Sequence, residues 1–161
     1  MNIAFYKLVV VEEDKPALLK LKEVKSADTI YGNNPQVIAD WCKNALYMDR
    51  LMQEEVYLLF LHSSLRVKGI IQLAQGGEDS AVFSTACLYR EVLLSGSSKI
   101  VVIHNHPSGR LDPSTQDMTM TEQLMRGCML LGITLLDHII IGDGYYSFHE
   151  QGLLEGKEDD K

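Results

Sequence analysis

Runs of apolar residues alternate along the chain with turn-forming segments, and this pattern predicts a series of short β-strands. Each run is rich in β-branched residues or is apolar on both faces, which is typical of strands buried within a sheet. Turns such as Gly76-Gly77 and Gly142-Asp143-Gly144 separate the runs. The predicted strands cover residues 3–11, 56–62, 67–75, 99–104, 133–142 and 145–149.

Three further segments carry apolar residues at helical spacing, each behind a residue that favours a helix start. Asn34 followed by Pro35 is a cap residue with proline in the first turn, and Ser84 and Ser114 are the expected caps of the second and third helices. Gly132 is expected to end the third helix. The residues at this spacing are Ile38, Trp41, Cys42 and Ala45, then Cys87, Leu88, Glu91, Val92 and Leu94, then Thr121, Leu124, Met125, Cys128 and Leu131. Because strands and helices alternate without repeats, we predict a mixed α/β domain.

The size and composition of the chain agree with one globular domain. Its 161 residues suffice to bury a core, and 46% apolar and 23% charged residues are ordinary for a globular protein. No apolar run approaches the roughly 20 residues that span a bilayer, and the first residues predict no signal peptide. We expect a strand and extension at 1–33, the main domain at 34–150, and an acidic, disordered tail at 151–161.

The charge and the cysteine content limit which binding partners and which cellular compartment we expect. The formal net charge is −7 and lysine and arginine do not cluster, which disfavours a duplex-binding surface because such a surface must neutralise phosphates. The three cysteines are widely spaced and form no Cys-x-x-Cys pair, which is typical of small core residues in a reducing compartment. We therefore expect a cytoplasmic protein without a membrane segment, and its oligomeric state stays open.

A histidine pair closes the predicted strand 99–104. His104 and His106 lie two residues apart, so their side chains point to one side if the strand extends through them. Imidazole nitrogens suit zinc, but a hydrolytic zinc site needs three protein ligands and an open position for water. Asp117 is the candidate third ligand because it shares a helix face with Thr121, and an inward-facing carboxylate needs a partner.

A structural interpretation competes with the metal site. Ser114 and Asp117 also form a capping-box pattern, with serine at the cap and an acid at the third helical position. A lone His-x-His pair is likewise a weak metal signal. The two roles of Ser-x-x-Asp are compatible in part, because the cap sets the helix position while Asp117 faces the metal. Other His-x-His hydrolases fit poorly: Ser108 stands where metallo-β-lactamase-like enzymes have an acid, and an amidohydrolase barrel needs roughly 250 residues.

The complete motif resembles that of the JAMM (JAB/MPN-plus) metallo-isopeptidases. His104-x-His106, seven residues, Ser114, two residues and Asp117 match the spacing of that family at every position. The string HNHPSG, with LLGITLLDHIIIGDG downstream, resembles the RadC-like bacterial branch, and the similarity covers residues 36–148. RadC proteins often carry an N-terminal helix-hairpin-helix region, which the first 35 residues do not resemble. The resemblance implies a cytidine-deaminase-like, three-layer JAB/MPN fold with a mixed β-sheet flanked by helices.

The resemblance also implies a role for each site residue. Ser114 would donate a hydrogen bond to the developing oxyanion. The family requires a glutamate before a core strand, and DRLMQEEVYLLFLH resembles that segment. We assign Glu55 as the general base because Glu55-Val56-Tyr57 matches the Glu-x-aromatic pattern, with Glu54 as the alternative and a solvated acid pair as the structural explanation. The implied ligands of one zinc ion per chain are His104, His106 and Asp117.

Other polar residues near the motif are given structural roles. Asn105, between the two histidines, is expected to brace the loop. Asp137-His138 is either a satisfied polar pair near a strand or a partner that supports the metal ligands from behind. His62 and His149 are interpreted as ordinary surface or packing residues.

Two functions follow. The first is a zinc-dependent hydrolase that cleaves a peptide or isopeptide bond in a protein or peptide substrate. The second is a RadC-like nucleic-acid-associated factor of the DNA-repair type, or an enzyme that processes DNA with the same metal site, and the acidic charge argues against it. An inactive MPN-minus scaffold is a third option, but such scaffolds usually lose their ligands and this chain keeps them. The substrate stays open.

Overall fold

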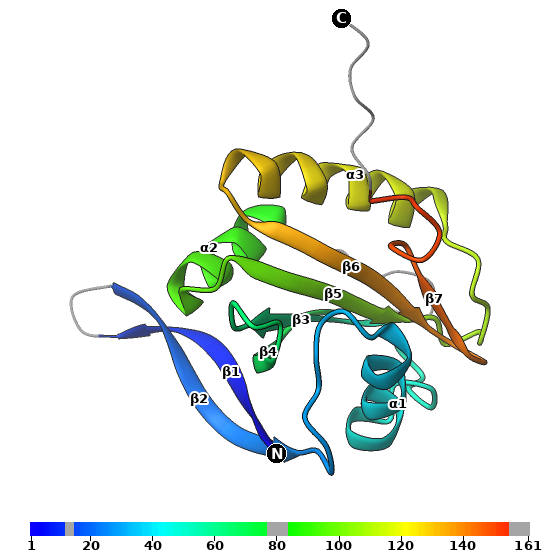
Figure 1. Ribbon diagram of the computed structural model, residues 1–161, viewed down its shortest axis with the longest axis horizontal. Helices are drawn as coiled ribbons and strands as arrows, with labels where there is room; N and C mark the ends of the chain where they lie inside the picture. Colours follow the sequence, from blue (N-terminus) through cyan, green and yellow to red (C-terminus); the bar gives the residue numbers. More distant parts are fainter. Residues whose placement is uncertain (12–14, 77–83, 155–161) are drawn as a thin grey trace, which may run out of the picture.

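The computed structural model describes residues 1–11, 15–76 and 84–154, and in them seven strands and three helices form three layers (Figure 1). The strands are β1 (Asn2–Val11), β2 (Lys15–Lys25), β3 (Glu55–Leu61), β4 (Val67–Gln75), β5 (Lys99–Asn105), β6 (Thr134–Ile141) and β7 (Tyr145–Ser147). The helices are α1 (Pro35–Leu46), α2 (Thr85–Ser95) and α3 (Thr115–Leu130). The prediction of a mixed α/β fold is confirmed.

A single mixed sheet forms the middle layer. Its strand order is β2-β1-β4-β3-β5-β6-β7, in which β1 runs parallel to β4 and β5 runs parallel to β6, while the other neighbours are antiparallel. Helix α1 covers one face of this sheet, and α2 and α3 cover the other (Figure 1). This is the three-layer arrangement expected of a JAB/MPN-like domain.

Alternation along the central strands divides the core into two halves. Successive side chains of a strand point to opposite faces, so each strand contributes to both halves. The half beneath α2 and α3 contains Val56, Leu58 and Phe60 of β3 with Ile100 and Val102 of β5. The half beneath α1 contains Tyr57, Leu59 and Leu61 of β3 with Val101 and Ile103 of β5. Continued to the end of β5, the same alternation puts His104 on the α3 side and Asn105 on the α1 side.

The helix starts follow the predicted caps. The Asn34 side chain accepts a hydrogen bond from the Val37 N–H at 3.1 Å, and Pro35 occupies the first turn of α1. Ser84 stands at the N-cap of α2, although its side chain makes no capping hydrogen bond. Gly132 follows the C-cap of α3 with φ +66°, a conformation that glycine adopts without strain. These punctuating residues explain why the helix bounds could be predicted.

The apolar spacing of the second and third helices continues past their buried residues. Leu94 and Leu131 lie at this spacing but are 40% and 44% exposed. Both lie beyond Val92 and Cys128, the last residues of α2 and α3 that are buried against the sheet. Apolar spacing continues past the point at which each helix leaves the core, so spacing alone overstates the buried length.

Strand β2 was not predicted, because most of its side chains are exposed. It pairs with β1 as a hairpin from Asn2↔Lys25 to Val11↔Lys15 and forms one edge of the sheet. At the other terminus, residues 148–154 form turns after β7, while 155–161 of the predicted tail lie outside the described residues. Among the described residues, no helix has the length and apolar character needed to cross a membrane.

Candidate metal centre

The two histidines of the motif lie at the end of β5 and at the start of the loop that follows it. The His106 N–H donates to the carbonyl oxygen of Ile141 at 2.8 Å, so the contact between β5 and β6 continues past the strand. In the same loop, Gly109 adopts φ +78° and its carbonyl oxygen accepts a hydrogen bond from the Asp143 N–H at 2.9 Å. The loop is thereby docked on the β6–β7 turn, which holds His106 beside His104.

Asp117 reaches the site from the first turn of α3. The Ser114 hydroxyl accepts from the Asp117 N–H at 3.1 Å, and the Asp117 Oδ2 accepts from the Ser114 N–H and hydroxyl, both at 2.7 Å. The predicted capping box is therefore present. The same carboxylate is turned towards the sheet and is only 3% exposed, so capping and an inward-facing aspartate occur together.

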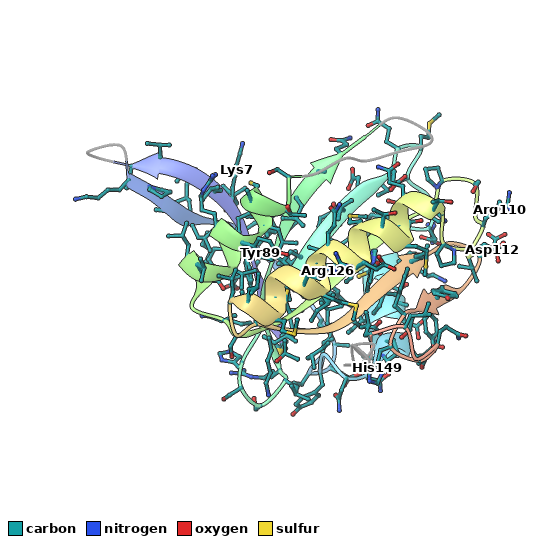
Figure 2. All side chains as sticks on the ribbon, turned by 90° about the horizontal axis from the view of Figure 1, so that it is seen from above. Lys7, Tyr89, Arg110, Asp112, Arg126 and His149 are labelled. Carbon is teal, nitrogen blue, oxygen red and sulfur yellow. The ribbon has the colours of Figure 1, made fainter. Side chains whose placement is uncertain are left out.

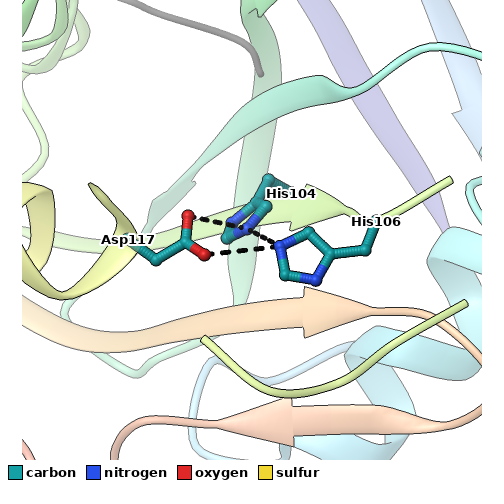
Figure 3. A group of neighbouring side chains, drawn as sticks. All are labelled: His104, His106 and Asp117. Carbon is teal, nitrogen blue, oxygen red and sulfur yellow. Dashed lines mark hydrogen bonds and ion pairs between the residues drawn. The ribbon is translucent and has the colours of Figure 1, made fainter. Parts of the chain in front are cut away.

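The side chains of His104, His106 and Asp117 converge on one point (Figure 3). The His104 Nε2 lies 3.2 Å from Asp117 Oδ1, the His106 Nε2 lies 3.3 Å from Oδ2, and the two Nε2 atoms are 3.1 Å apart. Ligands about 2.0–2.1 Å from a tetrahedral zinc ion lie roughly 3.3 Å from one another. The spacing of these donor atoms therefore fits a single small divalent ion.

The hydrogen bonds on the far side of each ring direct Nε2 towards this point. The His106 Nδ1 lies 3.0 Å from the carbonyl oxygen of Arg110. A carbonyl oxygen only accepts, so this Nδ1 carries a hydrogen, and in the neutral ring that a metal binds the His106 Nε2 keeps its lone pair. The His104 Nδ1 lies 2.8 Å from the Nε2 of His138. Histidine ligands of metals ordinarily donate their second N–H in this way, which orients the ring.

The electrostatics of the group favour a bound positive charge. Burial acts to raise the pKa of Asp117, but the adjacent imidazole rings of His104 and His106 outweigh burial and hold that pKa well below its usual range. The hydrogen bond to Asp117 raises the pKa of His106, against the opposing effect of burial, and the carboxylate of Glu54 acts in the same direction as Asp117. The carboxylate therefore stays ionised among converging nitrogen atoms, which is the environment that a cation completes.

The structure does not bring Glu55, the predicted general base, to this group. Its carboxylate accepts a hydrogen bond from the Tyr57 hydroxyl at 2.5 Å, and Tyr57 packs in the core half beneath α1. Val56 pairs directly with His104, so these two side chains share the α3 face and Glu54 has the same parity as Val56. Glu54 is 7% exposed and its charge acts on His106. The assignment of Glu55 as the general base stays a prediction, and its alternative, Glu54, is the acid of this segment whose charge acts on the converging group.

Asn105 holds the segment that carries Glu54. Its side-chain oxygen accepts from the Glu55 N–H at 2.8 Å, and its amide group donates to the Gln53 carbonyl oxygen at 3.1 Å. The residue that separates the two histidines thus binds the backbone on both sides of Glu54. It braces the neighbouring segment and not the 106–113 loop, for which it was predicted.

Each residue of the Asp137-His138 pair has one of the two roles predicted for the pair. Asp137 accepts hydrogen bonds from the His138 and His149 N–H groups. It also accepts from the Ser147 hydroxyl, so it is a satisfied buried acid. His138 is fully buried and contacts His104 directly, so it is the partner behind a candidate ligand.

Thr121 is a site residue that the sequence interpretation missed. Its hydroxyl lies 2.7 Å from the His138 Nδ1 and 2.7 Å from the backbone oxygen of Asp117. It had been predicted only as part of a buried helix face. A hydroxyl-bearing residue one helical turn after Asp117, on the face that carries the ligand, was the signal available in the sequence.

The loop between β5 and α3 begins at His106 and is exposed in part. Arg110 and Asp112 of this loop have exposed side chains, 3.7 Å apart, at the end of the molecule far from Lys7 in β1 (Figure 2). The converging group includes neither His62, whose ring contacts Arg66, nor the exposed His149. Among the described residues, both histidines of the converging group therefore come from the 104–117 segment.

Comparison with known proteins agrees with this geometry. Residues 32–153 match the family model of the RadC-like JAB domain. The chain belongs to the RadC-like JAB domain family. It is 36% identical over 110 residues to a UPF0758 protein of Porphyromonas gingivalis, covering 67% of this chain and 48% of the relative. It is 34% identical over 139 residues to a UPF0758 protein of Clostridium acetobutylicum, covering 84% and 58%. The RadC-like JAB domain described here thus spans about half the length of these curated relatives.

Proposed function

We propose that this RadC-like JAB domain is a zinc-dependent hydrolase that cleaves a peptide or isopeptide bond with activated water. The observation that carries the proposal is the convergence of His104, His106 and Asp117 at distances suited to one tetrahedral ion. Membership in the family supports it, because JAB domains are often hydrolytic. Zinc bound by three protein ligands would leave one position for water and lower the pKa of that water to about 7.

The chain's own residues supply the proton transfer and the oxyanion contact. Glu54, on the same face as His104, would accept the proton of the attacking water and deliver it to the departing amine. The Ser114 hydroxyl, which donates to Asp117 Oδ2 in this structure, would turn to donate to the developing oxyanion. A donor of this kind typically lowers the barrier by about 3 kcal/mol.

Metal analysis followed by a hydrolysis assay tests the proposal. Protein purified without chelator should contain close to one zinc per chain, or bind it on titration, and should cleave an isopeptide-linked fluorogenic substrate. His106→Ala should lose both metal and turnover, whereas His149→Ala, which changes a histidine outside the group, should keep both. A wild-type protein that binds no zinc, or that binds it but hydrolyses neither peptide nor isopeptide bonds, would defeat the proposal.

The same preparation tests a nucleic-acid substrate. We expect no binding of DNA at low salt, because the net charge of −7 opposes the neutralisation of phosphates. Salt-dependent binding accompanied by DNA cleavage would move the proposed chemistry from an amide to a phosphodiester.

A further inference from the structure

A chain of buried hydrogen bonds connects two of the candidate ligands without passing through the metal position. It runs from His104 Nδ1 to His138 Nε2 (2.8 Å), from His138 Nδ1 to the Thr121 hydroxyl (2.7 Å), and from that hydroxyl to the Asp117 carbonyl oxygen (2.7 Å). His104 and His138 are fully buried and Thr121 is 2% exposed. Water does not reach these groups, so each must find its hydrogen-bond partner within the chain. A link with two donors or two acceptors would therefore be costly.

The direction of the chain follows from its last link. A carbonyl oxygen only accepts, so the single hydroxyl hydrogen of Thr121 is given to Asp117. The hydroxyl then has only lone pairs for His138, whose Nδ1 must carry the hydrogen. A neutral imidazole has one N–H, so the His138 Nε2 accepts from the His104 Nδ1. The His104 Nε2 is left with a lone pair 3.2 Å from Asp117 Oδ1, and a cation between these two acceptor atoms would satisfy both.

The opposite direction leaves a contact unexplained. If Thr121 donated to His138, its oxygen would face the Asp117 carbonyl oxygen at 2.7 Å without a hydrogen between them. His138 would then donate to His104, whose Nε2 would carry the hydrogen and could not bind a metal. Only one direction satisfies all three contacts, and it is the one that leaves His104 ready for a cation.

We propose that Thr121, acting through His138, fixes the ring tautomer of His104 and so prepares its Nε2 to bind the metal. Thr121 and His138 are positioning residues, because neither side chain belongs to the converging group itself. The proposal rests on the metal site of the proposed function but not on the reaction that the site performs.

The surroundings of His138 hold its ring in place for this role. Phe148 stacks on the ring with centroids 4.7 Å apart and planes 13° apart, and the Asp137 carboxylate accepts a hydrogen bond from the backbone N–H of His138. The ring of His138 is fully buried, and complete burial disfavours a charged imidazole. The ring is therefore neutral and fixed, and its one hydrogen must be on either Nδ1 or Nε2.

A matched pair of substitutions tests the proposal. Thr121→Val keeps the shape of the side chain but removes the hydroxyl, whereas Thr121→Ser keeps the hydroxyl. Zinc affinity is measured by competition with a chromogenic chelator. We expect Thr121→Val to weaken binding by about 10–100-fold, the usual effect of losing a hydrogen-bond partner behind a ligand, and Thr121→Ser to stay within about threefold of the wild type. Equal affinities in the two variants would overturn the proposal.

A second measurement does not depend on any variant or on activity. Long-range proton–nitrogen correlation spectra of the metal-free wild-type protein distinguish Nδ1–H from Nε2–H imidazole. We expect Nδ1–H for His138, and an Nε2–H signal would overturn the proposed direction. If the wild type takes up no zinc, the proposed function fails, while this spectrum still decides the direction of the chain.

Discussion

The Asn105 side chain accepts a hydrogen bond from the Glu55 N–H, 2.8 Å away, and so ties the end of β5 to the start of β3. Asn105 is fully buried, and its amide also donates to the Gln53 carbonyl oxygen. The side chain between the two candidate histidine ligands thereby positions the segment that carries Glu54, the acid that we propose as the general base. The candidate metal ligands and the proposed base are thus connected through one short segment of chain.

Replacing this clamp should impair catalysis more than metal binding. Asn105→Ala leaves the partly buried Glu55 N–H and Gln53 carbonyl group without their side-chain partner, so we expect a loss of about 1–3 kcal/mol in the free energy of unfolding for the two lost hydrogen bonds. The value of kcat should fall because Glu54 is no longer held, whereas zinc affinity should change little because the ligands lie on the other face. Urea denaturation, zinc titration and turnover are measured for Asn105→Ala and for the control Asn33→Ala, which changes an exposed asparagine. A variant with wild-type kcat would remove the clamp from the mechanism.

Substituting Glu54 and Glu55 in turn tests which of the two acids is the general base. Glu54→Gln should lower kcat by roughly 10²–10⁴-fold, the range for a lost general base. Glu55→Gln should stay near wild-type activity, because the Gln side chain can still accept from the Tyr57 hydroxyl on the α1 face. Both variants should bind zinc. Steady-state kinetics on the zinc-loaded proteins measures the difference, and the reverse ranking would restore Glu55 as the base.

Ser114 has two roles that different substitutions separate. Ser114→Ala should cost about 1 kcal/mol of stability through the lost cap, whereas Ser114→Gly should cost only about a few tenths. Both remove the hydroxyl, so both should lower kcat by roughly 10²–10³-fold. Ser84→Ala is the control, because Ser84 makes no side-chain capping bond in α2. Thermal unfolding and kcat are measured together, and a kcat that tracked stability alone would leave Ser114 only a structural role.

Loop docking at Gly142 should affect the metal site from a distance. A Cβ atom at Gly142 would lie 2.4 Å from the Gly109 carbonyl oxygen, which is backbone and cannot turn aside. Gly142→Ala should therefore displace the loop that holds His106, destabilise the fold by about 1–3 kcal/mol and weaken zinc binding. Gly144→Ala is the matched control, because its Cβ would meet only a flexible Leu111 methyl group at 3.3 Å. Equal zinc affinity for the two variants would argue against loop docking as a determinant of the site.

A buried acid in α2 should make stability depend on pH. Glu91 is 3% exposed, its Oε2 has no hydrogen-bond partner among the described residues, and burial raises its pKa to about 7. The folded protein therefore favours the protonated form, so the contribution of Glu91 is fully present below the unfolded-state pKa of about 4.3 and is lost as pH rises through 7. Glu91→Gln should remove this loss. The free energy of unfolding of the variant should therefore exceed that of the wild type by a margin that grows between about pH 4 and 7, to at most roughly 3 kcal/mol. Urea denaturation at several pH values measures it, and a pH-independent difference between the two proteins would contradict it.

Among the described residues, the sequence by itself predicted the three helices, every strand except β2, and the candidate metal ligands. Asn34-Pro35, Ser114 and Gly132 marked helix ends because their local chemistry acts within one turn. The apolar runs predicted the central strands because both faces of those strands are buried. Strand β2 has mostly exposed side chains, so no apolar pattern in the sequence indicated it.

Only the tertiary structure decided which neighbours of the ligands matter. The choice between Glu54 and Glu55 depended on the pairing of Val56 with His104, because a shift of one residue moves a side chain to the other face of the sheet. The hydrogen bond between Thr121 and His138 joins residues 17 positions apart, on a helix and a strand that only the packing of α3 over β6 brings together. Local sequence patterns report local forces, whereas strand register and helix packing arise from the whole core at once.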